Sequence, residues 1–151
     1  EGLGEAEYDR GRFAAARQAF QSAVRLNPEN ETVRKNLTTV EAILSLDPTL
    51  RGLSSAERYR RSRSLLEGIL SSLERCDAVH HVSAADESLR KNVEAARVAM
   101  GRRRRPGSYS DATDANVALA LQLWEDRSDL CGPLTEGEEA LSRVMRQLSP
   151  Q

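Results

Sequence analysis

"GEAEYDRGRFAAARQAFQSAVRLNP", residues 4–28, sets small and bulky apolar side chains at helical intervals and ends on a proline. Gly11 permits a tight turn between two helical segments, and Pro28 cannot continue the second segment. Ala16 lets two helices approach closely, and Phe20 fills the space that such an approach leaves between them. The stretch therefore predicts an antiparallel helical hairpin.

The spacing in this stretch resembles a tetratricopeptide repeat, a helical hairpin of about 34 residues. The matched positions are Leu3, Gly4, Gly11, Phe13, Ala16, Phe20, Ala23, Leu26 and Pro28. The family's aromatic residue in the first helix is displaced, because Glu7 occupies its place and Tyr8 stands beside it. The resemblance covers residues 1–47 well. It implies an all-α fold in which hairpins stack into a right-handed solenoid.

The rest of the chain also predicts helices, because apolar residues recur three or four positions apart and alternation with a period of two is not sustained. Three capping boxes mark helix starts: Ser54 with Glu57, Ser83 with Asp86, and Thr135 with Glu138. Counting the segments between Pro and Gly breaks gives about seven helices. Trp124 lies in a segment that is apolar around much of its circumference, so it is the largest core candidate.

We expect three parts along the chain. Residues 1–47 form the hairpin and the helix after it, residues 48–82 supply the helix of a degenerate second repeat, and residues 83–151 form a helical cap packed on the array. Four residues of the middle part repeat the spacing of the first hairpin: Tyr59, Ser62, Leu66 and Ile69. A degenerate unit suits the end of a stacked array, where the outer face must be polar.

The start of the chain suggests a fragment, because no initiator Met is present and Glu1 falls inside a helix that is already running. A lost neighbour would leave an apolar face, through which the N-terminal helix could self-associate. The compartment stays open: a cytoplasmic location is slightly favoured, and an export signal or a membrane anchor would lie in the missing part. Within the chain no apolar run approaches the roughly 18 residues of a membrane span.

Composition excludes an overall electrostatic bias toward nucleic acid, since 30% of residues are charged and the net charge is -1. Only Lys35 and Lys91 are lysines among the 22 basic residues, which a codon bias in a GC-rich bacterial genome explains. The run Arg102 to Arg105 is interpreted as a solvated loop, and nucleic-acid binding through it is the alternative. The cluster of Arg58, Arg60, Arg61 and Arg63 is interpreted as the exposed face of a helix.

Motifs for catalysis are absent: the sequence has no Gly-rich phosphate loop, no G-x-S-x-G and no H-E-x-x-H. We therefore expect no enzyme activity and no cofactor. In the group Cys76, Asp77, His80 and His81, Cys76 and His80 stand four apart and would share a helix face. A zinc site needs about four ligands in a closed geometry and only Cys131 offers a further, distant thiolate, so no metal is expected. Cys76 and Cys131 both lie near predicted helix ends. A bond between them would imply an oxidising compartment, and two free thiols are the favoured interpretation.

The resemblance implies a groove lined by the first helices of the repeats, where peptides bind. The candidate groove residues are Glu1, Glu5, Tyr8, Asp9, Lys35 and Thr39. Acids at positions 1 and 5 would repel the peptide carboxylate that one version of the family clamps, so the expected partner segment is basic or amphipathic. The sequence predicts a non-catalytic protein-interaction scaffold. The alternative is a regulatory or docking domain of a larger enzyme or secretion assembly.

Overall fold

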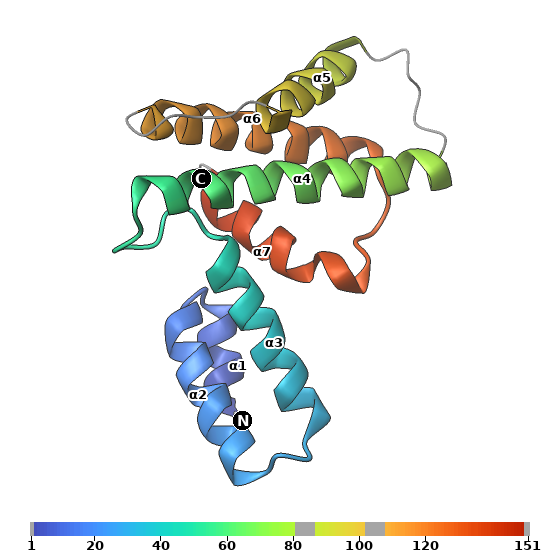
Figure 1. Ribbon diagram of the computed structural model, residues 1–151. Helices are drawn as coiled ribbons and strands as arrows, with labels where there is room; N and C mark the ends of the chain where they lie inside the picture. Colours follow the sequence, from blue (N-terminus) through green and yellow to red (C-terminus); the bar gives the residue numbers. More distant parts are fainter. Residues whose placement is uncertain (1, 81–86, 102–107, 150–151) are drawn as a thin grey trace. The chain divides into compact units, whose positions relative to one another are not determined.

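The computed structural model describes residues 2–80, 87–101 and 108–149, and the regular structure within these ranges is helical (Figure 1). The helices are α1 (Gly2–Asp9), α2 (Phe13–Leu26), α3 (Glu31–Leu46), α4 (Ser55–His80), α5 (Glu87–Gly101), α6 (Tyr109–Leu130), the short 3₁₀ helix η1 (Glu136–Glu138) and α7 (Glu139–Leu148). For the described residues, the predicted all-α class and the predicted number of about seven helices are confirmed. The predicted capping box of Ser83 and Asp86 lies outside them.

The chain divides into two compact units, Glu1–Ser45 and Leu46–Gln151. The first unit holds α1, α2 and nearly all of α3, and the second holds α4 to α7. Helix α4 therefore belongs to the same unit as the helices that follow it. The division of the sequence into a repeat, a degenerate repeat and a cap stays a prediction.

The bend between α1 and α2 is made by Gly11, whose φ of 77° lies in the left-handed region that favours glycine. The Gly11 N–H donates to the carbonyl of Tyr8 at 3.0 Å, and the Arg12 N–H donates to the carbonyl of Glu7 at 2.9 Å. The Tyr8 and Phe13 rings meet edge to face across the bend, with their centroids 5.5 Å apart. Local hydrogen bonds and one aromatic pair thus fix the turn.

The two helices of the hairpin approach closely because their contact positions are small. A Cβ atom added to Gly4 would lie 2.5 Å from Cε1 of Phe20, which is closer than carbon atoms pack. Ala16 and Phe20 are almost completely buried. Close packing of a glycine against a large ring therefore holds α1 to α2.

Helix α3 begins at a side-chain cap, since Oδ1 of Asn30 accepts a hydrogen bond from the backbone N–H of Val33 at 3.2 Å. Val33, Val40 and Ile43 are buried. Helix α3 thus buries an apolar face.

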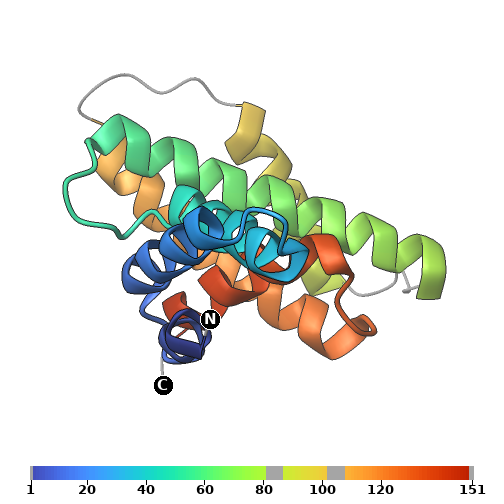
Figure 2. The same cartoon turned by 90° about the horizontal axis from the view of Figure 1, so that it is seen from below.

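In the second unit, α4 and α6 run side by side in the same direction (Figures 1 and 2). Near their starts the rings of Tyr59 and Tyr109 have centroids 5.3 Å apart. Near their ends the Cα atoms of Cys76 and Cys131 are 5.5 Å apart. Helix α6 also contacts α5 and α7, so it has neighbours on more than one side, as its apolar circumference predicts.

The core of this unit lies where α4, α6 and α7 meet. Its buried apolar side chains are Tyr59, Leu65, Leu66, Ile69, Leu70 and Leu73 of α4, Ala112, Ala120 and Leu123 of α6, and Leu141, Val144 and Met145 of α7. Ser62 is also buried among them, where it donates to the carbonyl of Tyr59 and accepts from the amide of Asn116 at 3.1 Å. The interpretation of Trp124 as the largest core residue is wrong, because its side chain is only half-buried.

Candidate binding surfaces

The residues predicted to line a peptide groove lie on α1 and α3. Glu5 and Asp9 are exposed, and Tyr8 is half-buried against Phe13. Glu5 and Asp9 are four positions apart on one helix, so both carboxylates extend from the same face of α1.

On α3, Lys35 is exposed and Thr39 is half-buried. Glu1 lies outside the described residues. Among the groove candidates, Glu5 and Asp9 therefore provide an acidic pair that solvent or a partner can reach.

The matched repeat positions differ in burial, and Gly11 and Ala23 are half-buried. Gly4, Phe13, Ala16 and Phe20 are buried within the hairpin, as their sizes require. Leu3 and Leu26, at the other extreme, are 68% and 88% exposed. These two leucines lie near the start of α1 and the end of α2, which meet at the open end of an antiparallel hairpin. The positions that hold the two helices together are thus covered, whereas these two leucines are not.

A hollow of about 790 Å³ lies on the second unit, lined by α6, by the segment before η1 and by α7. Its apolar lining includes Leu121, Trp124 and Leu134, and Leu134 is 39% exposed. Three charged side chains also line it, namely Glu125 and Arg127 of α6 and Arg146 of α7. This surface was not predicted from the sequence. The sequence signal that could have indicated it is Trp124, a large side chain in a helix that is apolar around much of its circumference.

Cys76 and Cys131 form a disulfide, which joins the end of α4 to the residue after α6. The expectation of two free thiols is therefore wrong for this structure. The bond is sterically feasible because α4 and α6 run in parallel, and their ends bring the two Cα atoms within the distance that a disulfide requires.

Next to the disulfide, a buried polar cluster joins α4, α6 and η1. The Ser72 hydroxyl accepts a hydrogen bond from Nε of Arg127 at 2.7 Å and donates to the Glu138 carboxylate. The other carboxylate oxygen of Glu138 accepts from the Thr135 N–H at 2.9 Å and from the Thr135 hydroxyl at 2.7 Å. The predicted capping box of Thr135 and Glu138 is thus present, and its acid also receives contacts from two other helices.

The charges of this cluster compensate one another. Arg127 and Glu138 are 6% and 3% exposed, and Nε of Arg127 lies 3.8 Å from Oε2 of Glu138. Burial raises the pKa of Glu138, but hydrogen bonds from Ser72 and Thr135 and the charge of Arg127 outweigh it. The pKa falls from 4.5 to about 2. Arg75 adds a second ion pair to the same oxygen at 3.4 Å. This cluster is a structural connection, because its polar atoms are directed at one another.

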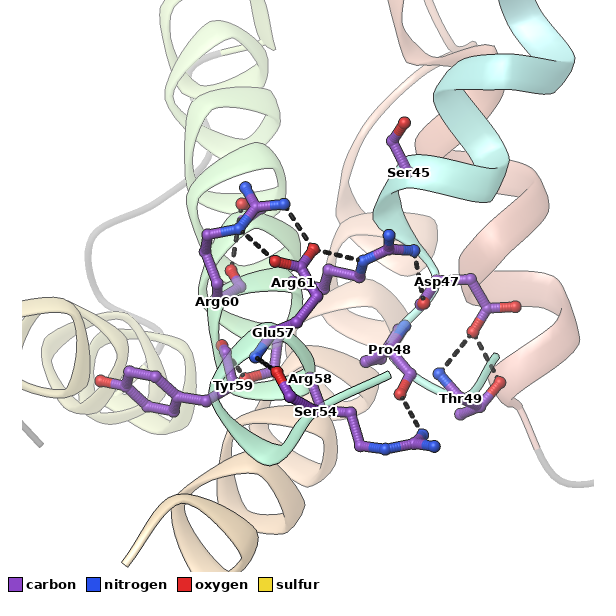
Figure 3. A network of polar contacts seen from close by, with 12 residues as sticks. Ser45, Asp47, Pro48, Thr49, Ser54, Glu57, Arg58, Tyr59, Arg60 and Arg61 are labelled. Carbon is purple, nitrogen blue, oxygen red and sulfur yellow. Dashed lines mark hydrogen bonds and ion pairs between the residues drawn. The ribbon is translucent and has the colours of Figure 1, made fainter. Parts of the chain in front are cut away.

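The arginine cluster at the start of α4 is not a uniformly exposed face, contrary to the sequence interpretation (Figure 3). Arg58 donates to the carbonyl of Pro48 at 2.8 Å, and Arg61 donates to the carbonyl of Asp47 at 3.2 Å. Arg63 donates to the carbonyl of Met100 at the end of α5. Three guanidinium groups thus satisfy backbone carbonyls.

Glu57 organises the same region (Figure 3). Its N–H is capped by the Ser54 hydroxyl at 3.1 Å, as the predicted box requires. Its carboxylate accepts hydrogen bonds from Arg60 and Arg61, which lower the pKa of Glu57 from 4.5 to about 2. The carboxylate is thereby directed along α4, and not back to Ser54 as in a complete capping box.

Two other predicted features lie outside the described residues, namely the run Arg102 to Arg105 and His81. In the part of the chain that the structure describes, no group of three or more His, Cys, Asp and Glu side chains is arranged to hold a metal ion. None of the helices there has the length and apolarity needed to cross a membrane. Compared with protein-family models, curated proteins and solved structures, the chain has no match in any of the three.

Proposed function

We propose that this chain is a non-catalytic protein-interaction scaffold, whose first unit is a tetratricopeptide-like repeat that binds a peptide segment. The observation that carries the proposal is the contact between Gly4 and Phe20. A Cβ atom at Gly4 would overlap the ring, so the close approach of α1 and α2 depends on the small residue that the repeat pattern places there. The Gly11 bend and the buried Ala16 support the same assignment.

The partner segment is proposed to be basic or amphipathic. Glu5 and Asp9 are exposed on one face of α1, four residues apart, where they can pair with Lys or Arg side chains of a bound segment. Exposed charges of this kind contribute mainly to the rate and specificity of association. Binding is therefore expected to weaken as the salt concentration rises.

The test is a selection of random displayed peptides on the full chain, followed by fluorescence anisotropy with a selected peptide. We expect enrichment of Lys and Arg, and a Kd at least about tenfold weaker for the double variant Glu5→Arg/Asp9→Arg. Glu41→Arg is the matched control, since Glu41 is exposed on α3 two positions from Thr39 and thus on the opposite side of that helix. Selection of acidic peptides, or equal affinity for all variants, would contradict the proposal.

A further inference from the structure

The hollow between α6 and α7 is lined by apolar side chains and by three charged ones. Arg127 is buried and paired with Glu138, which leaves Glu125 on α6 and Arg146 on α7. Trp124 and Leu134 contribute large apolar side chains that are only partly covered. Both Glu125 and Arg146 are exposed. Within the described part of the chain, neither of these two charges has an ion-pair partner. Such a surface combines partly covered apolar side chains with two charges available to a partner.

We propose that this hollow is an interface between two copies of the chain. A twofold axis that lies in the interface and runs along the hollow, between α6 and α7, places the same surface of each copy against the other. Glu125 of one copy then faces Arg146 of the second, and the reverse pair forms on the other side of the axis. The apolar lining residues of the two copies then meet, and Trp124 is covered. A hollow with an exposed acid on α6 and an exposed base on α7 is therefore complementary to itself.

The charge pattern favours a second copy over a segment of one sign. A purely basic segment would pair with Glu125 but be repelled by Arg146, and a purely acidic segment would meet the reverse problem. A second copy presents both signs at the required separation. Trp and Arg are also the side chains most enriched among residues that dominate binding energy at interfaces. The acidic pair on α1 is not among the residues that line this hollow.

The first measurement is sedimentation velocity of the full chain from about 1 to 500 μM, a range that brackets a weak dimer. Trp124 is the only tryptophan of the chain, so its emission reports on this surface alone. We expect a monomer–dimer equilibrium and a blue shift of emission over the same concentration range. A monomer at every concentration, or a dimer without any change in Trp124 emission, would overturn the proposal.

Charge reversal tests the pairing itself. Glu125→Arg and Arg146→Glu, made singly, are expected to weaken dimerisation about tenfold or more, because each creates two like-charge contacts. The double variant restores the opposite pairs and is expected to recover the dissociation constant to within about threefold. Matched controls are Glu94→Arg and Arg90→Glu, which change exposed charges on α5. Single variants that dimerise normally, or a double variant that does not recover, would contradict this interface.

Discussion

Reducing the disulfide between Cys76 and Cys131 is expected to lower the free energy of unfolding of the second unit by about 4 kcal/mol. The bond closes a loop across 55 residues of sequence separation, which include α5 and α6. The chain-entropy relation assigns about 4 kcal/mol at 25 °C to a crosslink of this length, because the oxidised unfolded chain has fewer conformations. In this relation the stabilisation arises from the restriction of the unfolded chain.

The assay is urea unfolding followed by Trp124 fluorescence, with oxidised and reduced protein compared. Since Trp124 lies in α6, its emission reports on the unit that contains the crosslink. With a urea m-value of about 1.5 kcal/mol/M, the midpoint should fall by roughly 2.5 to 3 M. The variant Cys76→Ser/Cys131→Ser is the control for the reductant, because the reductant should not change its midpoint.

Two results would refute this reasoning. A thiol assay on the denatured, untreated protein that finds two free thiols would show that the bond is absent. A midpoint that shifts by less than about 0.7 M, equivalent to about 1 kcal/mol, would show that the crosslink does not restrict the unfolded chain as the entropy relation requires.

Three further changes test the packing. Glu138→Gln should destabilise the protein by about 3 kcal/mol at pH 7, because the pKa of Glu138 is about 2 in the folded state and 4.5 in the unfolded state. The wild-type protein should lose this stability as the pH falls from about 4.5 to about 2, and the variant should not. Urea unfolding measured at a series of acidic pH values checks this. Gly4→Ala should lower the stability of the first unit by about 1 to 2 kcal/mol, measured by thermal circular dichroism, because its Cβ overlaps Phe20; a raised melting temperature would contradict this packing. Asn116→Ala and Ser62→Ala should each lower the free energy of unfolding, measured in urea, by about 1 to 2 kcal/mol. The double variant should lose less than the sum of the two single losses, and strict additivity would exclude a hydrogen bond between the two side chains.

The local features of the fold could be predicted from the sequence because they depend on neighbours along the chain. Gly11 is the bend of the hairpin, and Thr135 caps a helix, since turns and caps are set by residues within a few positions. The positions Leu66 and Ile69 face the core because helical periodicity determines which side of α4 is apolar. Each of these features could be inferred from one helix or turn, without knowing which other helix packs against it.

The features that were missed depend on which helices meet. Ser72, Arg127 and Glu138 are brought together from three elements, and no local pattern of residues indicates their contact. The disulfide depends on α4 and α6 being parallel, which spacing alone does not reveal. The interpretation of Arg58 as part of an exposed face is wrong because the carbonyl of Pro48, in the segment before α4, accepts its guanidinium hydrogen bond. Each of these features depends on contacts between residues that lie far apart in the sequence.

Helix α6 shows the difference between what a local sequence pattern predicts and what the packing of the helices decides. Its sequence is apolar around most of its circumference, which calls for neighbours on several sides, and α4, α5 and α7 supply them. Leu121 and Trp124 nevertheless remain only half-buried, so the apolar circumference exceeds what these three helices cover. Covering these side chains would remove further apolar surface from water, which contributes a favourable free energy of roughly 25 cal/mol for each Å² buried. The apolar excess of α6 is therefore the physical basis for a second copy on the α6–α7 hollow, and Glu125 and Arg146 determine its orientation.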